Sequence, residues 1–211
     1  MKLDVPYLTY QDIGRKTQEF LSLYHPSLSI PVPIEQIIEF DLEMNIIPLP
    51  NLYRQFSING FLTSDFEEIY VDEIQFSKYN EKYRFTLAHE LGHFVLHKDS
   101  FKDVSVTSLQ EYVGWHKMAD NDDIGWFETH GNWFAEQLLV PSQQLVAVYE
   151  SVIKKHKKLF AKLPKVPPDV WSYLSNEICL NFQVSPAVIE CRMRREGITS
   201  EASFITLSQG L

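Results

Sequence analysis

Residues 84–97 of this chain read Arg-Phe-Thr-Leu-Ala-His-Glu-Leu-Gly-His-Phe-Val-Leu-His. They contain the pattern His-Glu-x-x-His, in which His89 and His93 are one turn of an α-helix apart and so share a face. Two imidazoles at this spacing can bind one zinc ion, and the adjacent carboxylate of Glu90 can act as a general base. The stretch predicts a helix from about Glu81 to His97 that carries a metal site.

The distribution of side chains around this helix supports a buried metal site. On a helical wheel two sides are apolar, and one sector of about 100° gathers the polar side chains. These are Thr86, His89, Glu90, His93 and His97. Unpaired imidazoles and carboxylates cost several kcal/mol to bury, and binding a metal would pair them. The alternative is a row of histidines on a solvated surface.

His97 is not expected to be a third ligand. It follows His89 by eight residues, a rise of about 12 Å along a continuous helix, so one ion cannot bind both. We expect His97 to contact a ligand from behind, or to act as a cation at the C-terminus of the helix.

The third ligand is expected from a second helix, which runs from about Trp126 to Val140. Glu128 and Asn132 are four residues apart and share a face, so Glu128 can reach the ion while Asn132 hydrogen-bonds a ligating imidazole. His130 points to the opposite side. Glu128 can also be explained as an exposed first-turn glutamate favoured by the helix dipole. Acidic residues just upstream are alternative ligands: Asp120, Asp122 and Asp123.

The remaining pattern predicts an α+β fold. Helical spacing occurs from Tyr10 to Tyr24 and resumes near Asp169, and a last helix begins at Ser185-Pro186. Short apolar segments between Met44 and Val71, separated by Asn-Gly and Ser-Asp turns, predict a small antiparallel sheet. We expect this sheet to pack against a helical bundle that carries the His-Glu-x-x-His helix, with a helical C-terminal part.

Composition and charge exclude several classes of protein. Hydrophobic residues make up 45% of the chain and charged residues 22%, which excludes disordered and fibrous architectures. The net charge of −9 argues against direct nucleic-acid binding. Cys179 and Cys191 do not indicate a disulfide framework. Because no apolar leader or membrane span is evident, a cytoplasmic protein without membrane contact is expected.

The two motifs together resemble the ImmA/IrrE family of bacterial and phage metallopeptidases. The resemblance rests on residues 84–93 and on the pattern Glu128-x-x-x-Asn132-x-Phe134-Ala135-x-x-Leu138-Leu139-x-Pro141. The second pattern is similar to the Glu-x-x-x-Asp of thermolysin-like gluzincins, with Asn in place of Asp. The segments flanking both motifs also resemble the family, so the resemblance covers about residues 30–200. A separate N-terminal helix-turn-helix domain is not evident, and the insert 99–125 is not matched.

The resemblance implies a zinc-dependent endopeptidase that selectively cleaves a partner regulatory protein, such as the repressor of a mobile element or of a stress response. Zn²⁺ would be held by His89, His93 and Glu128, and Glu90 would take a proton from water and deliver it to the leaving amine. The partner would be a DNA-binding transcriptional regulator. A zincin-like metallopeptidase domain is expected over residues 1–150, with a helical C-terminal subdomain packed on it over residues 151–211.

Two details of such an active site stay open at this point. Three residues are candidate donors to the oxyanion of the transition state: Tyr83, Tyr112 and His116. An extended substrate is expected to add to a strand edge, either in Gly60–Leu62 or in Ile69–Val71.

The alternative function belongs to a different class, a zinc-containing regulatory or toxin-like binding module with little peptidase activity. Such a module would contact DNA through its basic C-terminal helices, where Arg192, Arg194 and Arg195 lie close together. Glu90 favours the enzyme, because a purely structural zinc site does not need this carboxylate.

Overall fold

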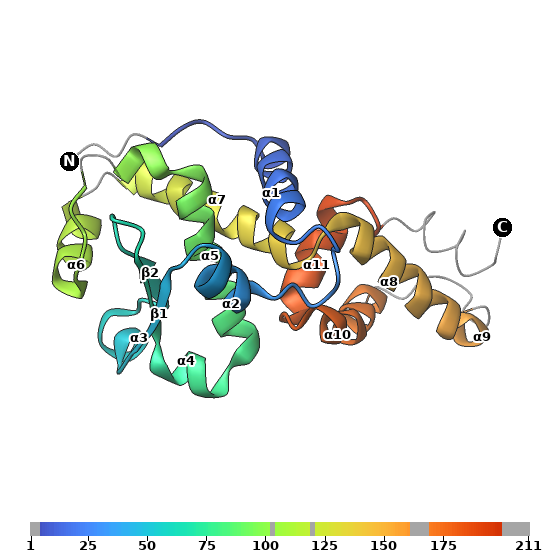
Figure 1. Cartoon of the computed structure of the whole chain (residues 1–211). Coiled ribbons are helices and arrows are strands. Elements are labelled where there is room, and N and C mark those ends of the chain that lie inside the picture. Colours follow the sequence, from blue (N-terminus) through green and yellow to red (C-terminus); the bar gives the residue numbers. More distant parts are fainter. Residues whose placement is uncertain (1–4, 102–103, 119–120, 161–168, 200–211) are drawn as a thin grey trace. The chain divides into compact units, whose positions relative to one another are not determined.

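The computed structural model describes residues 5–101, 104–118, 121–160 and 169–199 (Figure 1). Contacts within the chain divide it into two compact units. The first contains residues 1–27 and 33–138, and the second contains residues 28–32 and 139–211. A domain boundary at residue 150 would lie inside helix α8 (Ser142–Lys155), and the expected packing of a C-terminal subdomain stays a prediction.

The sheet of the first unit has three strands in the order β1-β3-β2. β2 (Gly60–Leu62) and β3 (Glu68–Asp72) pair antiparallel, as predicted. β1 (Asn45–Leu49) pairs with β3 in parallel, so the expectation of an antiparallel sheet is wrong for this pair, and the sheet is mixed. The chain passes through α3 (Leu52–Phe56) and β2 before it returns beside β1, and parallel neighbours require such a crossover. The α+β class itself is confirmed.

Helix α5 (Asn80–Leu96) carries the His-Glu-x-x-His pattern, and its bounds agree with the predicted helix to within one residue. It packs against β2 and β3 and also contacts α1, α2 and α4 (Figure 1). Leu87, Ala88 and Leu91 are fully buried, and the polar residues Glu90 and His93 are buried with them. The predicted burial of ionisable groups on this helix is therefore confirmed.

The first unit contains further helical elements, which lie before, between and after these strands and α5 along the chain. They are α1 (Tyr10–Tyr24), α2 (Ile34–Gln36), the π-helix η1 (Ile37–Asp41), α4 (Glu73–Lys78), the 3-10 helix η2 (Lys98–Phe101), α6 (Leu109–Met118) and α7 (Asn121–Leu139).

Helices α5 and α7 approach each other closely because each has a glycine where they meet, Gly92 on α5 and Gly131 on α7. A methyl group on Gly92 would lie 3.0 Å from Cβ of Phe134 and 3.3 Å from Cα of Gly131. A larger residue at position 92 would therefore separate the two helices. α7 begins at Asn121 rather than near Trp126, so Asp122 and Asp123 lie in its first turn.

Helix α6 belongs to the insert 99–125, which lies between the two sequence motifs that carry the resemblance. Its residue Trp115 is buried in an aromatic cluster. The cluster includes Phe61 of β2, Phe101 of η2 and Phe127 of α7. The hydroxyphenyl ring of Tyr112 stacks on Phe61 at 4.8 Å between ring centroids. These contacts attach the insert to the sheet and to α7.

The second unit is helical. It contains α8, α9 (Lys157–Phe160), α10 (Val170–Phe182) and α11 (Pro186–Arg195), and α11 packs on α10. Its buried side chains include Leu174, Ile178, Phe182, Ile189 and Met193.

Arg192 has a structural position in this unit rather than a surface one. The guanidinium is fully buried, and its Nε donates a hydrogen bond to the carbonyl oxygen of Val140 at 3.1 Å. A terminal nitrogen donates to Oγ of Ser142 at 2.9 Å and pairs with Glu196 at 2.8 Å. One of the three arginines invoked for DNA contact is therefore part of the interior, which weakens that alternative.

Two expectations drawn from composition can be compared with the structure. Neither Cys179 nor Cys191 forms a disulfide. In the part of the chain that the structure describes, no helix has the length and apolar character needed to cross a membrane.

Candidate active site

Three predicted ligands converge in the first unit, two from α5 and one from α7. Nε2 of His89 lies 3.0 Å from Nε2 of His93 and 3.1 Å from Oε2 of Glu128. One ligand atom from each residue lies within 4.8 Å of the others. Two imidazole nitrogens and a carboxylate oxygen form a donor set suited to a divalent metal such as zinc.

The alternative acidic ligands do not join this group. Asp122 and Asp123 lie in the first turn of α7 and are absent from the cluster of potential ligands among the described residues. Asp120 lies outside the described residues. Glu128 is half-buried, so its explanation as a freely exposed first-turn glutamate does not fit its position.

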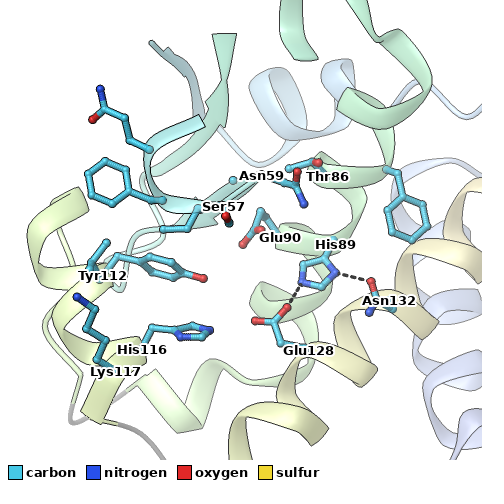
Figure 2. Close-up of a pocket in the computed structure, with 16 residues that line it drawn as sticks. Ser57, Asn59, Thr86, His89, Glu90, Tyr112, His116, Lys117, Glu128 and Asn132 are labelled. Carbon is cyan, nitrogen blue, oxygen red and sulfur yellow. Dashed lines mark hydrogen bonds and ion pairs between the residues drawn. The ribbon is translucent and has the colours of Figure 1, made fainter. Parts of the chain in front are cut away.

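His89 is held from its other side by α7. Its Nδ1 lies 3.0 Å from Oδ1 of Asn132, the hydrogen bond predicted from the four-residue spacing of Glu128 and Asn132 (Figure 2). With Nδ1 hydrogen-bonded to the amide oxygen, Nε2 carries the lone pair that a metal needs.

His93 is held from behind by His97, which in turn contacts His130. Its Nδ1 lies 3.1 Å from Nδ1 of His97, and Nε2 of His97 lies 3.0 Å from Nδ1 of His130 on α7. His97 therefore contacts the predicted ligand His93 from behind, which agrees with the first of the two alternatives considered for it. No local pattern in the sequence indicates this contact of His130, because it joins residues 33 positions apart.

The carboxylates of the site have opposite pKa shifts. Burial raises the pKa of Glu90 to about 7, against a lowering by His89. The pKa of Glu128 is lowered although burial acts to raise it, because the hydrogen bond and charge of His89 and the charge of His116 outweigh burial. Glu90 is thus the stronger base of the two, and Glu128 the better anionic ligand.

The two imidazoles of the cluster also differ. Burial keeps the pKa of His93 well below its ordinary value, so this ring is neutral. For His89 burial also favours the neutral form, but the hydrogen bond that its ring donates to Glu128 and the charges of Glu90 and Glu128 raise its pKa. A proton therefore competes with a metal more strongly at His89 than at His93.

A cavity of about 700 Å³ opens beside the cluster. It is lined by residues of α5, α6 and α7 and by the segment that leads into β2, including Gly60. Tyr112, His116 and Lys117 form its α6 side, facing Glu90 and Glu128 (Figure 2). Tyr83, the third candidate donor, is not among the lining residues and interacts with Glu35 instead. The insert thus supplies one wall of the cavity.

A helix-borne His-Glu-x-x-His pair, with a third ligand from the next helix and an adjoining cavity, is the arrangement of a metallopeptidase site. Comparison with known families agrees, since residues 74–193 match the family model of the IrrE N-terminal-like domain, Peptidase M78. The match covers more than half of the chain, which therefore belongs to this peptidase family. The resemblance to the ImmA/IrrE family is confirmed. No curated protein matches the chain significantly.

Proposed function

We propose that this protein is a zinc-dependent endopeptidase that selectively cleaves a partner regulatory protein. The observation that carries the proposal is the convergence of two imidazole nitrogens and one carboxylate oxygen, from His89, His93 and Glu128, at a cavity that Glu90 also lines. This donor set fits zinc, and the neighbouring carboxylate fits a general base.

A zinc ion held by these three residues would supply Lewis acidity, which polarises a water molecule and the carbonyl group of the scissile bond. Glu90 accepts the proton of the attacking water and then delivers it to the leaving amine. The pKa of Glu90, raised to about 7 by burial, makes this carboxylate a stronger base than an exposed glutamate. Asn132 keeps the ring of His89 oriented through Nδ1.

The oxyanion of the transition state needs a donor besides the ion, and we assign that role to α6. Tyr112 and His116 both line the cavity, and their polar atoms face its interior (Figure 2). Burial and the charges of Glu90 and Glu128 hold the pKa of Tyr112 well above its ordinary value, so its hydroxyl keeps its hydrogen and can donate it.

We place the substrate along β2. β3 is the central strand and has a partner on each side, whereas β2 is at the edge of the sheet. Of the two segments considered from the sequence, only Gly60–Leu62 therefore offers a strand edge, and Gly60 also lines the cavity. An extended peptide added there would hydrogen-bond through its backbone and lie across the candidate site.

The proposed substrate is a DNA-binding transcriptional regulator that meets the protease in the cytoplasm. Backbone pairing with β2 reads little of a peptide's sequence, so selectivity must come from cavity side chains such as His116 and Lys117. We do not assign direct nucleic-acid binding, because the net charge is −9 and Arg192 is buried.

The test is to incubate the zinc-loaded chain with the regulator encoded beside its gene and to identify the fragments by mass spectrometry. We expect cleavage at one or a few bonds, and slow or absent cleavage of casein. The Glu90→Gln variant, with bound zinc, is the control for a contaminating protease. Rapid degradation of casein at many sites would reject the selective protease, and no cleavage of either protein would favour the binding module.

A further inference from the structure

Three buried histidines form a continuous hydrogen-bonded chain behind the proposed metal site. Nδ1 of His93 lies 3.1 Å from Nδ1 of His97, and Nε2 of His97 lies 3.0 Å from Nδ1 of His130. The exposed fractions of the three side chains are 3%, 0% and 1%. The chain begins at a proposed ligand on α5 and ends on α7.

Aromatic packing surrounds this chain and separates it from water. The ring of Phe127 lies flat on His93, with centroids 3.8 Å apart and planes at 6°, and it also stacks on His97 at 4.5 Å. Trp126 and Trp133 lie beside His130, at 6.0 and 6.1 Å between ring centroids. In such surroundings imidazoles are neutral, and each has one nitrogen that donates and one that accepts.

A neutral chain of this kind has a direction, because each hydrogen bond needs one donor and one acceptor. If Nε2 of His93 binds a metal, its hydrogen must be on Nδ1 and must be donated to Nδ1 of His97. The hydrogen of His97 is then on Nε2 and is donated to Nδ1 of His130. His130 in turn carries its hydrogen on Nε2. The opposite order would put a hydrogen on Nε2 of His93 and exclude a metal.

The last nitrogen of the chain, Nε2 of His130, is buried and has no partner in hydrogen-bond geometry among the described residues. In the order that leaves Nε2 of His93 free for a metal, this nitrogen carries the last hydrogen of the chain.

We propose that His97 and His130 are positioning residues that hold His93 in the tautomer and orientation required for metal binding. His97 and His130 would thus orient the ring of His93 and fix its tautomer, as the amide of Asn132 does for the ring of His89. The inference rests on the proposed metal site, and it adds two residues that the proposed function does not use. Loss of such partners behind a ligand typically lowers metal affinity by about 10- to 100-fold.

The first experiment measures zinc affinity of the full chain by competition with a chromogenic chelator. His97→Phe keeps a ring next to Phe127 but cannot accept a hydrogen bond from His93, and we expect a loss of affinity of about 10- to 100-fold. In His97→Asn, Oδ1 takes the place of Nδ1 as acceptor, so this variant should recover most of the loss. His156→Phe, a change in the second unit, is the matched control and should bind zinc like the unmodified chain.

The second experiment reads the positions of the hydrogens directly and needs no variant to fold. In the zinc-loaded chain with ¹⁵N-labelled histidine, NMR should show the ring hydrogen on Nδ1 of His93 and on Nε2 of both His97 and His130. His130→Phe removes the acceptor for the hydrogen on Nε2 of His97, so the ¹⁵N signal of that nitrogen should move toward the position of a ring N–H without a hydrogen bond. A residue that only fills space would leave that signal unchanged.

The outcomes separate the inference from the proposed function. If the unmodified chain fails to bind zinc, the metal site itself is overturned and the inference with it. If the unmodified chain binds zinc but His97→Phe binds equally well, only the inference is overturned. A hydrogen on Nδ1 of His97 in the zinc-loaded chain would also overturn the inference alone.

Discussion

The ring of His89 lies directly against the backbone of α7 at Gly131. A methyl group on Gly131 would lie 2.8 Å from Cε1, 2.9 Å from Nε2 and 3.0 Å from Nδ1 of this imidazole. No ordinary contact of a Cβ atom is that short, so a glycine at this position is a condition for the observed orientation of the proposed ligand. The contact also brings His89 within reach of Asn132 on the next position of the helix.

Gly131→Ala should therefore displace the ring of His89 and weaken zinc binding by about tenfold or more. Gly125→Ala is the matched control on the same helix, because nothing lies within 4 Å of a methyl group there. This control should keep its zinc affinity and gain up to about 1 kcal/mol of stability from helix propensity. Chelator competition and urea unfolding measure the two quantities. Equal zinc affinity in both variants would contradict the contact.

Metal content tests the proposed ligands. The purified chain should contain up to one zinc ion per molecule, and His89→Ala or His93→Ala should remove most of it while the fold is largely kept. His97→Ala should retain zinc after purification, since a partner behind a ligand changes affinity more than stoichiometry. Elemental analysis with circular dichroism checks these expectations. Zinc lost from His97→Ala but kept in Glu128→Ala would reverse the assignment.

Ligand and base are distinguished by two carboxylate variants. Glu90→Gln should keep zinc but lose proteolysis, because the amide cannot accept the proton of the attacking water. Glu128→Ala should lose both, because this carboxylate is proposed to coordinate the ion. Zinc content and cleavage of the regulator are measured on the same preparations. Equal loss of zinc in both variants would refute this division of roles.

The donors from α6 should affect the rate of cleavage without affecting the metal. Tyr112→Phe or His116→Phe should lower kcat by about 10²-fold if the residue donates to the oxyanion, and zinc content should stay unchanged. Tyr173→Phe, a change at a half-exposed tyrosine of the second unit, is the control. Unchanged kcat in both α6 variants would remove α6 from the catalytic machinery.

A pH-dependent contribution to stability is expected in the second unit. Hydrogen bonds and charges from Lys155 and His156, at 2.6 and 2.7 Å, lower the pKa of Glu177 below its ordinary value of about 4.5. The ionised carboxylate therefore stabilises the fold above that value, and the effect is lost as the pH falls through the lowered pKa. Glu177→Gln should cost about 1 kcal/mol or less at pH 7 and almost nothing near pH 2. Urea unfolding at both pH values measures the difference, and a constant difference would contradict the ion pairs.

Much of the candidate site could be predicted from the sequence because its geometry is local. The four-residue spacings of His89 with His93 and of Glu128 with Asn132 each define a helix face, and both faces meet in the structure. The apolar sides of α5 predicted its burial for the same reason.

The parts that could not be predicted depend on contacts between distant segments. Turn residues indicate where the chain reverses, but they do not decide that β3 lies between β1 and β2. In the same way, nothing near His130 indicates that its partner is His97. The position of α6 depends on Trp115 fitting into a cluster with Phe127, a match of shapes that no local pattern encodes.

The cavity wall and the proposed metal site belong to different helices, which has a consequence for how such an enzyme can diversify. The proposed ligands and base belong to α5 and α7, whereas one wall of the cavity belongs to α6, which has its own anchor, Trp115. Exchange of the exposed side chains of α6, with that anchor kept, would alter which peptides fit without touching the proposed ligands. Target choice and chemistry can then evolve, or be engineered, as separate traits of one chain.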